Sequence, residues 1–243
     1  MKRLTRLAAA ALLGLAAASA SAQSIRDEVT PEGLVAVKAR KVQRVWLMPG
    51  SDFRPYKKVL LKNAEVAFQK NWLRDVNDTG TPRLSSSGRV TQEDALRILD
   101  AARSGFDKVW AKAFKDGGYE VAAAPGDDVL EVVPRVVNLY VNAPASNRSG
   151  VRSTYTVEAG EGTLIMEVRD SRAGTVLGRL VDRRETLDGS MPTQATSASN
   201  MAEFERLFGV WAGIAVKGLD NLKAVSPVPE KLKPGQKLEA PGK

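Results

Sequence analysis

Hydrophobic and polar residues alternate along several short segments of the chain, with the period of two that is typical of strands half buried in a sheet. In the first segment, Val35 and Val37 alternate with Ala36 and Lys38, and Pro49-Gly50 marks a turn at its end. The turn over residues 170–175 joins the last two segments as an antiparallel hairpin. Strands are predicted over residues 34–48, 57–68, 119–124, 129–141, 163–170 and 176–184.

The apolar positions change parity inside the segment 129–141, around Pro134. Before the proline, Leu130 and Val132 share one face. After it, the regular apolar set has the opposite parity: Val137, Leu139 and Val141. Because proline has no N–H to donate to a neighbouring strand, this change predicts a bulge or an edge position near Pro134.

Two segments instead repeat apolar residues at spacings of three and four, which is the pattern of an amphipathic helix. The first begins after Thr91, an N-cap with Asp94 placed to complete a capping box, and ends at Gly117-Gly118. The second begins at Asn200, with Glu203 in the matching position. Their aromatic residues are predicted to be core rather than the wall of a ligand site. The two apolar stripes are Ala95, Ile98, Leu99, Ala102, Phe106, Val109, Trp110 and Ala113, and Phe204, Leu207, Phe208, Trp211, Ile214, Ala215, Gly218, Leu219 and Leu222.

This order of elements predicts an α+β fold, a mixed and mostly antiparallel sheet of about five to six strands with two amphipathic helices on one face. One domain should span residues 34–224. Residues 23–33 are polar and are expected to be a mobile lead-in, and residues 225–243 are rich in Pro and Lys and are expected to be a disordered tail. Three long polar loops are predicted: Asn77–Gly88, Ser146–Gly162 and Thr186–Ser199.

The first 22 residues have the pattern of a signal peptide. Lys2, Arg3 and Arg6 precede an uninterrupted run of Ala, Leu and Gly, and Ala20-Ser21-Ala22 supplies the small residues that a signal peptidase reads. We therefore expect cleavage before Gln23 and a periplasmic protein. The run is too short for a permanent membrane span. Because the chain has no cysteine to accept a lipid, it is expected not to be lipid-anchored.

Charge argues against a nucleic-acid partner. The chain has 36 basic and 28 acidic residues, and loss of the signal peptide removes three of the basic ones, which leaves 33. The remaining charges are interspersed, whereas nucleic-acid binding usually needs a dense basic face. Another envelope protein or a lipid surface is the expected partner, and the sequence leaves the oligomeric state open.

The residue types exclude much enzyme chemistry. With no His and no Cys, triads that depend on imidazole are excluded, and typical zinc and haem sites are implausible. No Gly-x-Ser-x-Gly, phosphate-loop or dinucleotide motif is present. No catalytic residue, metal ligand or cofactor is therefore predicted.

Carboxylates are the remaining candidates for catalysis. An acid–base pair needs two of them to converge, and Glu161, Asp170, Asp182 and Glu185 are the residues that would have to do so. Asp170 and Asp182 are expected to lie near each other across the hairpin. The more common use of Asp at a turn, as at Asp127-Asp128, is to bond the local backbone.

Residues 182–185 form the densest charged cluster of the chain. On a strand, Asp182 and Arg184 share one side, and Arg183 and Glu185 share the other. Ion pairing across strands on an exposed face is the favoured interpretation. The alternative is a partner-binding patch, whose candidate residues are Asp182, Arg183, Arg184 and Glu161.

Several segments resemble the domain-of-unknown-function family 3313, an uncharacterised group of bacterial envelope proteins that are often predicted lipoproteins. The resemblance spans residues 33–222, implies an envelope location and carries over no catalytic residue. The chain differs from the lipoprotein pattern in lacking the lipid-accepting cysteine. The segments are Trp46–Tyr56, Lys58–Leu61, Val66–Phe68 before Trp72, Tyr119–Val121, Val141–Pro144, Gly160–Leu164, Glu167–Asp170 and Val181–Arg184.

The leading hypothesis is a non-enzymatic periplasmic binding or accessory protein of the cell envelope. A carboxylate-based hydrolase or lyase is the first alternative. A periplasmic carrier of lipid or small molecules is the second, and it would need an apolar cavity.

Overall fold

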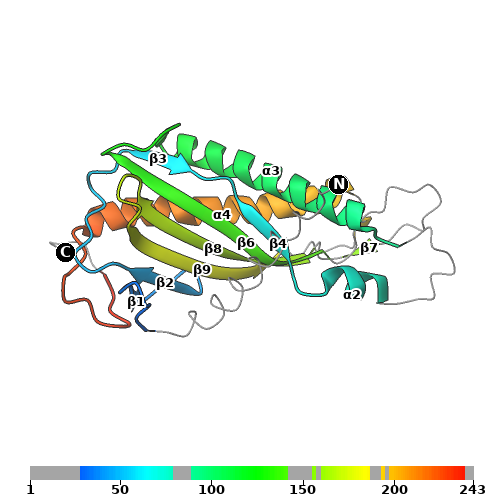
Figure 1. Ribbon diagram of the computed structural model, residues 1–243, viewed down its shortest axis with the longest axis horizontal. Coiled ribbons are helices and arrows are strands. Elements are labelled where there is room, and N and C mark those ends of the chain that lie inside the picture. Colours follow the sequence, from blue (N-terminus) through cyan, green and yellow to red (C-terminus); the bar gives the residue numbers. More distant parts are fainter. Residues whose placement is uncertain are drawn as a thin grey trace, which may run out of the picture.

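An eight-stranded sheet with two long helices on one face forms most of the structure, a computed structural model (Figure 1). The α+β prediction is confirmed, although the sheet has more strands than the expected five to six. The described residues are 28–78, 89–141, 155–156, 160–186, 193–194 and 197–238. The predicted signal peptide, its cleavage site and most residues of the predicted long loops lie outside them.

The sheet is mixed. Its strands are β1 (Val35–Val37), β2 (Arg44–Leu47), β3 (Lys58–Leu61), β4 (Glu65–Phe68), β5 (Glu120–Val121), β6 (Val129–Val141), β8 (Gly160–Asp170) and β9 (Val176–Glu185). They lie in the order β1-β2-β9-β8-β6-β3-β5, and β4 pairs with β6 next to β3. The pairs β3–β5, β3–β6 and β4–β6 are parallel and the others are antiparallel. A separate antiparallel pair joins β7 (Tyr155–Thr156) to β10 (Thr193–Gln194), which shows short strands inside two predicted loops.

Each of the first two predicted strand regions is divided into two strands. Residues 34–48 form β1 and β2, which are antiparallel neighbours. Residues 57–68 form β3 and β4, which pair in succession with β6. The break comes at Ala64, whose N–H donates to the Asp107 carboxylate at 2.9 Å instead of to a strand.

The parity change in β6 is confirmed, but it lies at Asn138 rather than at Pro134. Pro134 is buried and keeps the parity of the residues before it. Asn138 has a left-handed backbone (φ 52°), and the register with β8 shifts between Val137 and Tyr140. Pro134 faces the gap between β3 and β4, so its missing N–H costs no ladder hydrogen bond.

The helices follow the predicted patterns closely. α3 (Gln92–Asp116) has the capping box, with the Asp94 N–H donating to Thr91 Oγ1 at 3.1 Å. Its end is followed by Gly118 in the left-handed region (φ 83°). α4 (Ser197–Val225) begins three residues before the predicted start at Asn200. The short helix α2 (Trp72–Asp78) was not predicted and contains Asn77, the first residue of a predicted loop.

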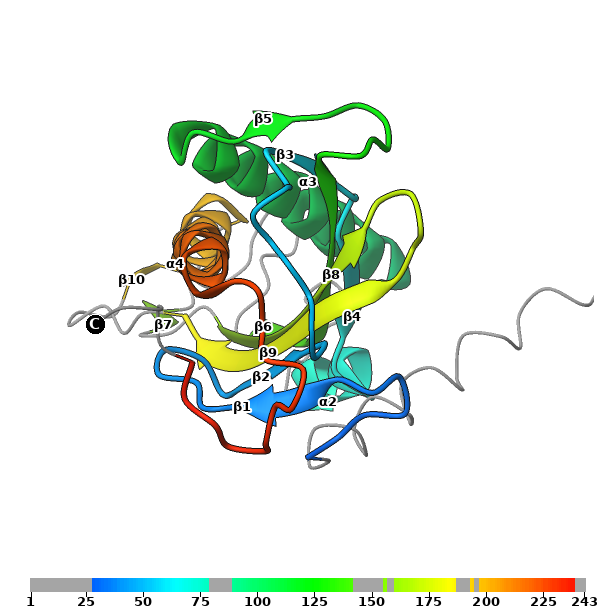
Figure 2. The same ribbon diagram turned by 90° about the vertical axis from the view of Figure 1, so that its left-hand side faces the viewer.

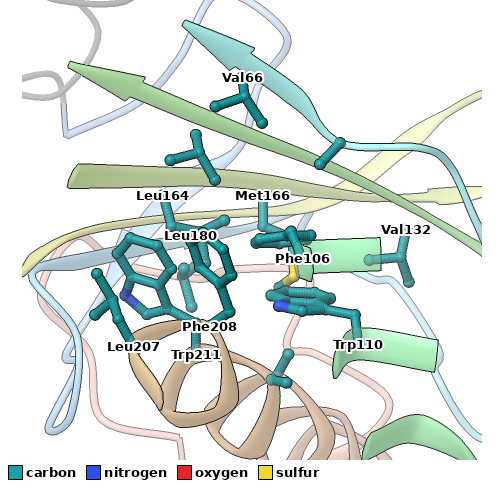
Figure 3. Close-up of a cluster of buried hydrophobic side chains, with 14 of the residues drawn as sticks. Val66, Phe106, Trp110, Val132, Leu164, Met166, Leu180, Leu207, Phe208 and Trp211 are labelled. Atoms are coloured by element: carbon teal, nitrogen blue, oxygen red, sulfur yellow. The ribbon is translucent and has the colours of Figure 1, made fainter. Parts of the chain in front are cut away.

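Seen end-on, the sheet curves around α3 and α4 (Figure 2). We call the face that carries these helices the inner face. Its core is rich in aromatic side chains, which fill the space between helices and sheet (Figure 3). Phe106 stacks on Trp110 with ring centroids 4.6 Å apart, and Phe208 stacks on Trp211 at 6.2 Å. The predicted core role of the aromatic stripes is thus confirmed.

Residues 28–33, expected to be a mobile lead-in, are hydrogen-bonded to the start of the sheet. The Thr30 side chain is buried, and its hydroxyl accepts the N–H of Leu34 at 3.2 Å. The N–H of Ala36 in β1 donates to Glu28. Polar composition suggested mobility, but here the polar groups bond a strand edge.

Residues 226–238, expected to belong to a disordered tail, also pack on the body of the protein. Val228 is 1% exposed and Leu232 is 8% exposed, and both join the main core. The N–H of Gly235 donates to Ala36 in β1. The prediction was wrong for these residues because a segment that cannot form its own core can still add apolar residues to an existing one.

Among the described residues, no helix combines the length and the hydrophobicity that crossing a membrane requires.

Candidate functional site

The charged cluster at residues 182–185 is divided between the two faces of the sheet. The cluster lies in β9, opposite the start of β8. Leu164 pairs with Asp182, and Thr163 pairs with Arg183. Leu164 belongs to the core under the helices. Asp182 therefore points to the inner face and Arg183 to the opposite one, which we call the outer face. The four partner-binding candidates do not form one patch.

Asp182 is a buried carboxylate that joins three parts of the fold. It is 4% exposed and accepts hydrogen bonds from Trp211 Nε1 at 3.0 Å, Arg184 Nε at 2.5 Å and the main-chain N–H of Gln43 at 3.1 Å. These donors come from α4, β9 and the segment between β1 and β2. Because a buried charge needs partners, this arrangement fixes α4 on the sheet. The expected exposed pairing is wrong for Asp182.

Arg184 is a half-buried partner of Asp182. Its Nη2 donates to the main-chain oxygen of Lys41 at 2.7 Å while its Nε bonds Asp182. The guanidinium thus joins the segment between β1 and β2 to β9, and these contacts occupy it within the fold. A structural role accounts for Asp182 and Arg184.

Arg183 and Glu161 lie on the outer face and form an ion pair. The Arg183 side chain is 58% exposed. Register places Tyr140 and Glu185 on the same face, each directly opposite Glu161. These four residues form what we call the Arg183 patch: Tyr140, Glu161, Arg183 and Glu185. The predicted ion pairing across strands on an exposed face is confirmed for this half of the cluster.

The four carboxylates considered for catalysis do not come together in one site, and Glu161 and Glu185 are the two of them that lie opposite each other. Asp170 lies at the far end of β8, where the Ala173 N–H and the Tyr56 hydroxyl hold its pKa below the ordinary value. Leu164, the partner of Asp182, is six residues away along β8, or about 20 Å at the usual rise per residue. Glu161 and Glu185 face each other, but Glu161 is bonded to Arg183 and points away from Asp182. Among the described residues, no three acidic side chains form a metal-binding group.

A second charged network on the outer face was not predicted. Glu167 is 7% exposed, and its carboxylate accepts hydrogen bonds from two arginines. Arg179 Nη2 donates to Oε1 at 2.8 Å, and Arg169 Nη2 donates to Oε2 at 2.5 Å. Arg179 also reaches Glu32 at 3.0 Å, which ties the segment before β1 to the sheet. The alternation of charges in β8 was visible in the sequence. The pairing of Glu167 with Arg179 was not, because a bulge between Val168 and Arg169 shifts the hairpin register.

Among the described residues, no long helix lies on the outer face, where arginines flank a small buried apolar cluster. Arg135, Ile165, Val181 and Arg44 form one row across β6, β8, β9 and β2. Ile165 and Val181 join a small apolar cluster with Trp46, and the guanidinium of Arg44 lies over the Trp46 ring at 5.6 Å. Arginine stems can shield such apolar residues from water while keeping their charges exposed.

The Glu167 network should make stability depend on pH. Burial raises the pKa of Glu167, but hydrogen bonds and charge from Arg169 and Arg179 outweigh it and hold the pKa below its ordinary value. A carboxyl with a lowered native pKa stabilises the fold above its unfolded pKa of about 4.3, and this contribution is lost as the pH falls through the native value. We expect the free energy of unfolding to fall below about pH 4.

The Glu167→Gln variant isolates this contribution. It should be less stable than the unmodified protein at pH 7, and the difference should shrink at pH 3, as measured by urea unfolding at both values. Glu65→Gln is the matched control, because the Glu65 side chain is 75% exposed in its pair with Arg135. A difference for Glu167→Gln that is the same at both pH values would contradict the assignment.

No known protein family and no curated protein matches the sequence. Among solved structures, a Xanthomonas campestris protein of the domain-of-unknown-function family 330 is similar at 15% identity and TM-score 0.36, over 69% of this chain and 83% of that one. The PelC dodecamer of Paraburkholderia phytofirmans is similar at 16% identity and TM-score 0.28, over 68% of this chain and 94% of that one. A minor lipoprotein of Acinetobacter baumannii is similar at 11% identity and TM-score 0.30, over 68% of this chain and 94% of that one. Similarity at this level assigns neither a family nor a function, and the resemblance to family 3313 stays a prediction.

Proposed function

We propose that this chain is a non-enzymatic binding protein of the bacterial cell envelope that holds a protein partner on the outer face of its sheet. The observation that carries the proposal is the composition of this face. It presents Arg44, Arg135 and Arg183 together with the half-buried Tyr140, and no long helix of the described chain covers it. Arginine and aromatic residues are enriched where proteins bind one another.

The Arg183 patch is the favoured centre of this surface. It lies at the end of the sheet where β6 ends at Val141, β8 begins at Gly160 and β9 ends at Glu185. The salt bridge between Arg183 and Glu161 is exposed and contributes little to stability. Its charges are therefore available for a partner at little cost to the fold.

The alternatives find less support in the geometry. An acid–base pair would require two carboxylates to converge. Asp170 and Asp182 lie apart from each other and from Glu161. Glu185 lies opposite Glu161, but Glu161 is bonded to the exposed Arg183. A carrier would require an apolar cavity, whereas aromatic side chains that are 0–2% exposed fill the space between the sheet and the helices. Binding through a surface requires neither feature.

Photocrosslinking in intact cells tests the proposal. A photoreactive amino acid at position 183 should give one defined adduct with another envelope protein, identified by mass spectrometry. The same amino acid at position 112 is the control, because the Lys112 side chain is 74% exposed on α3, away from the outer face. Absence of an adduct from positions 183, 135 and 44, or equal adducts from position 112, would contradict the proposal.

A further inference from the structure

Residues 226–238 form an extended strap that follows α4 and ends at the edge of β1 (Figure 2). The strap begins at Ser226, whose hydroxyl donates to Leu222 at the end of α4 and accepts the N–H of Phe53 at 3.0 Å. Its far part reaches β1, where Gln236 forms a parallel bridge with Val37. It therefore spans from the end of a helix to a sheet edge without forming a long element of its own.

The surface under the strap, which we call the strap site, bonds main-chain groups of the strap at two places. The N–H of Val228 donates to Ser51 at 2.8 Å, and the carbonyl of Val228 accepts from Gly50 at 3.1 Å. Farther along, Gly235 donates to Ala36 at 2.9 Å, and Gln236 accepts from Lys38 at 3.0 Å. The contacts at β1 are of the kind by which a sheet edge binds an added extended peptide.

Two apolar side chains, four positions apart, anchor the strap between these places. Val228 and Leu232 are both buried and contact the same cluster as Val35 of β1 and Phe53. Most of the other strap residues are exposed. The strap site thus binds a short pattern, two apolar anchors on an extended backbone, rather than a folded surface.

We propose that the strap site is an exchangeable docking site, which the strap of a second copy of the chain can occupy in place of the chain's own strap. Every copy carries a segment that matches the strap site. A segment held by two anchors and a few hydrogen bonds is among the parts of a fold that open most readily. Exchange of an identical element between copies needs no new contact. The proposal does not depend on the outer-face partner.

The attached strap has a kinetic and thermodynamic advantage over a second copy. A segment joined directly to its site acts at an effective concentration of the order of millimolar. Exchange is therefore rare in dilute solution and increases where copies are concentrated. A chain whose own strap is weakened should accept a foreign strap more often.

Engineered thiols can detect the exchange, because the chain has no cysteine of its own. Val37 and Gln236 are bridge partners, so cysteines at these positions have the separation that a disulfide requires. One chain carries Val37→Cys, a second carries Gln236→Cys, and the two are mixed under mild oxidation. Lys112→Cys replaces Val37→Cys as the control.

We expect the mixture of Val37→Cys and Gln236→Cys chains to give at least about tenfold more crosslinked heterodimer than the control, in a concentration-dependent manner. Adding Leu232→Asp to the Val37→Cys chain should raise the yield further. A single chain with both cysteines should close internally. Failure of that closure, or closure without heterodimer above the control, would each overturn the proposal.

Discussion

Replacing Asp182 with alanine is expected to lower the free energy of unfolding by about 3–5 kcal/mol, because it removes one partner from a buried charged group. Three donors lose their acceptor at once: Trp211 Nε1, Arg184 Nε and the N–H of Gln43. The guanidinium of Arg184 would be left partly buried without its carboxylate. Urea unfolding followed by tryptophan fluorescence measures the change, with far-UV circular dichroism to show that the fold persists.

Two comparisons separate the buried charge from a general effect of mutation. Asp127→Ala changes a carboxylate that is 87% exposed and should shift stability by no more than about 0.5 kcal/mol. Trp211→Phe removes only the indole donor and some core contact, so it should cost less than Asp182→Ala. A loss of less than about 1 kcal/mol for Asp182→Ala would show that the group does not hold α4 on the sheet.

The second large effect is expected at Gly160, the first residue of β8. Its φ of 154° is rarely adopted by other residues, and a Cβ there would lie 1.8 Å from the carbonyl oxygen of Tyr140. An alanine at this position would therefore force β6 and β8 apart where they pair. We expect Gly160→Ala to cost about 2–4 kcal/mol, from strain and overpacking together, measured by urea unfolding.

Gly174→Ala is the matched control for this change. Gly174 also has a positive φ, 68°, but a Cβ there would meet nothing within 4 Å. Its cost should be confined to the backbone preference, about 1 kcal/mol. Equal losses at the two glycines would mean that close approach of the strands at Gly160 is unimportant.

Local patterns predicted the helices and the long strands because each is determined by short-range spacing. The capping box at Thr91 and the apolar repeat behind it define α3 without reference to the rest of the chain. The strands of the hairpin are likewise defined by alternation. Division of residues 57–68 into β3 and β4 was not visible, because it depends on a bond from Ala64 to Asp107, a residue of α3.

The candidate site depended on register, and register depends on bulges. Asp182 shares its parity with Leu180, a core residue, so the sequence contained a signal that Asp182 faces inward. The charged neighbours on both sides of Asp182 obscured that signal. The pairing of Glu167 with Arg179 had no such signal, because the bulge beside Val168 changes which residues oppose each other.

The strap has a consequence for the order in which the chain can fold. Ser226 bonds Phe53, a residue 173 positions earlier, and Gly235 bonds Ala36 in the first strand of the sheet. The edge of β1 therefore acquires its last hydrogen bonds only when residues near the C-terminal end of the described chain are present. Contacts between such distant positions form late and slow the search for the native state. A growing polypeptide would keep that edge open until synthesis had passed residue 236.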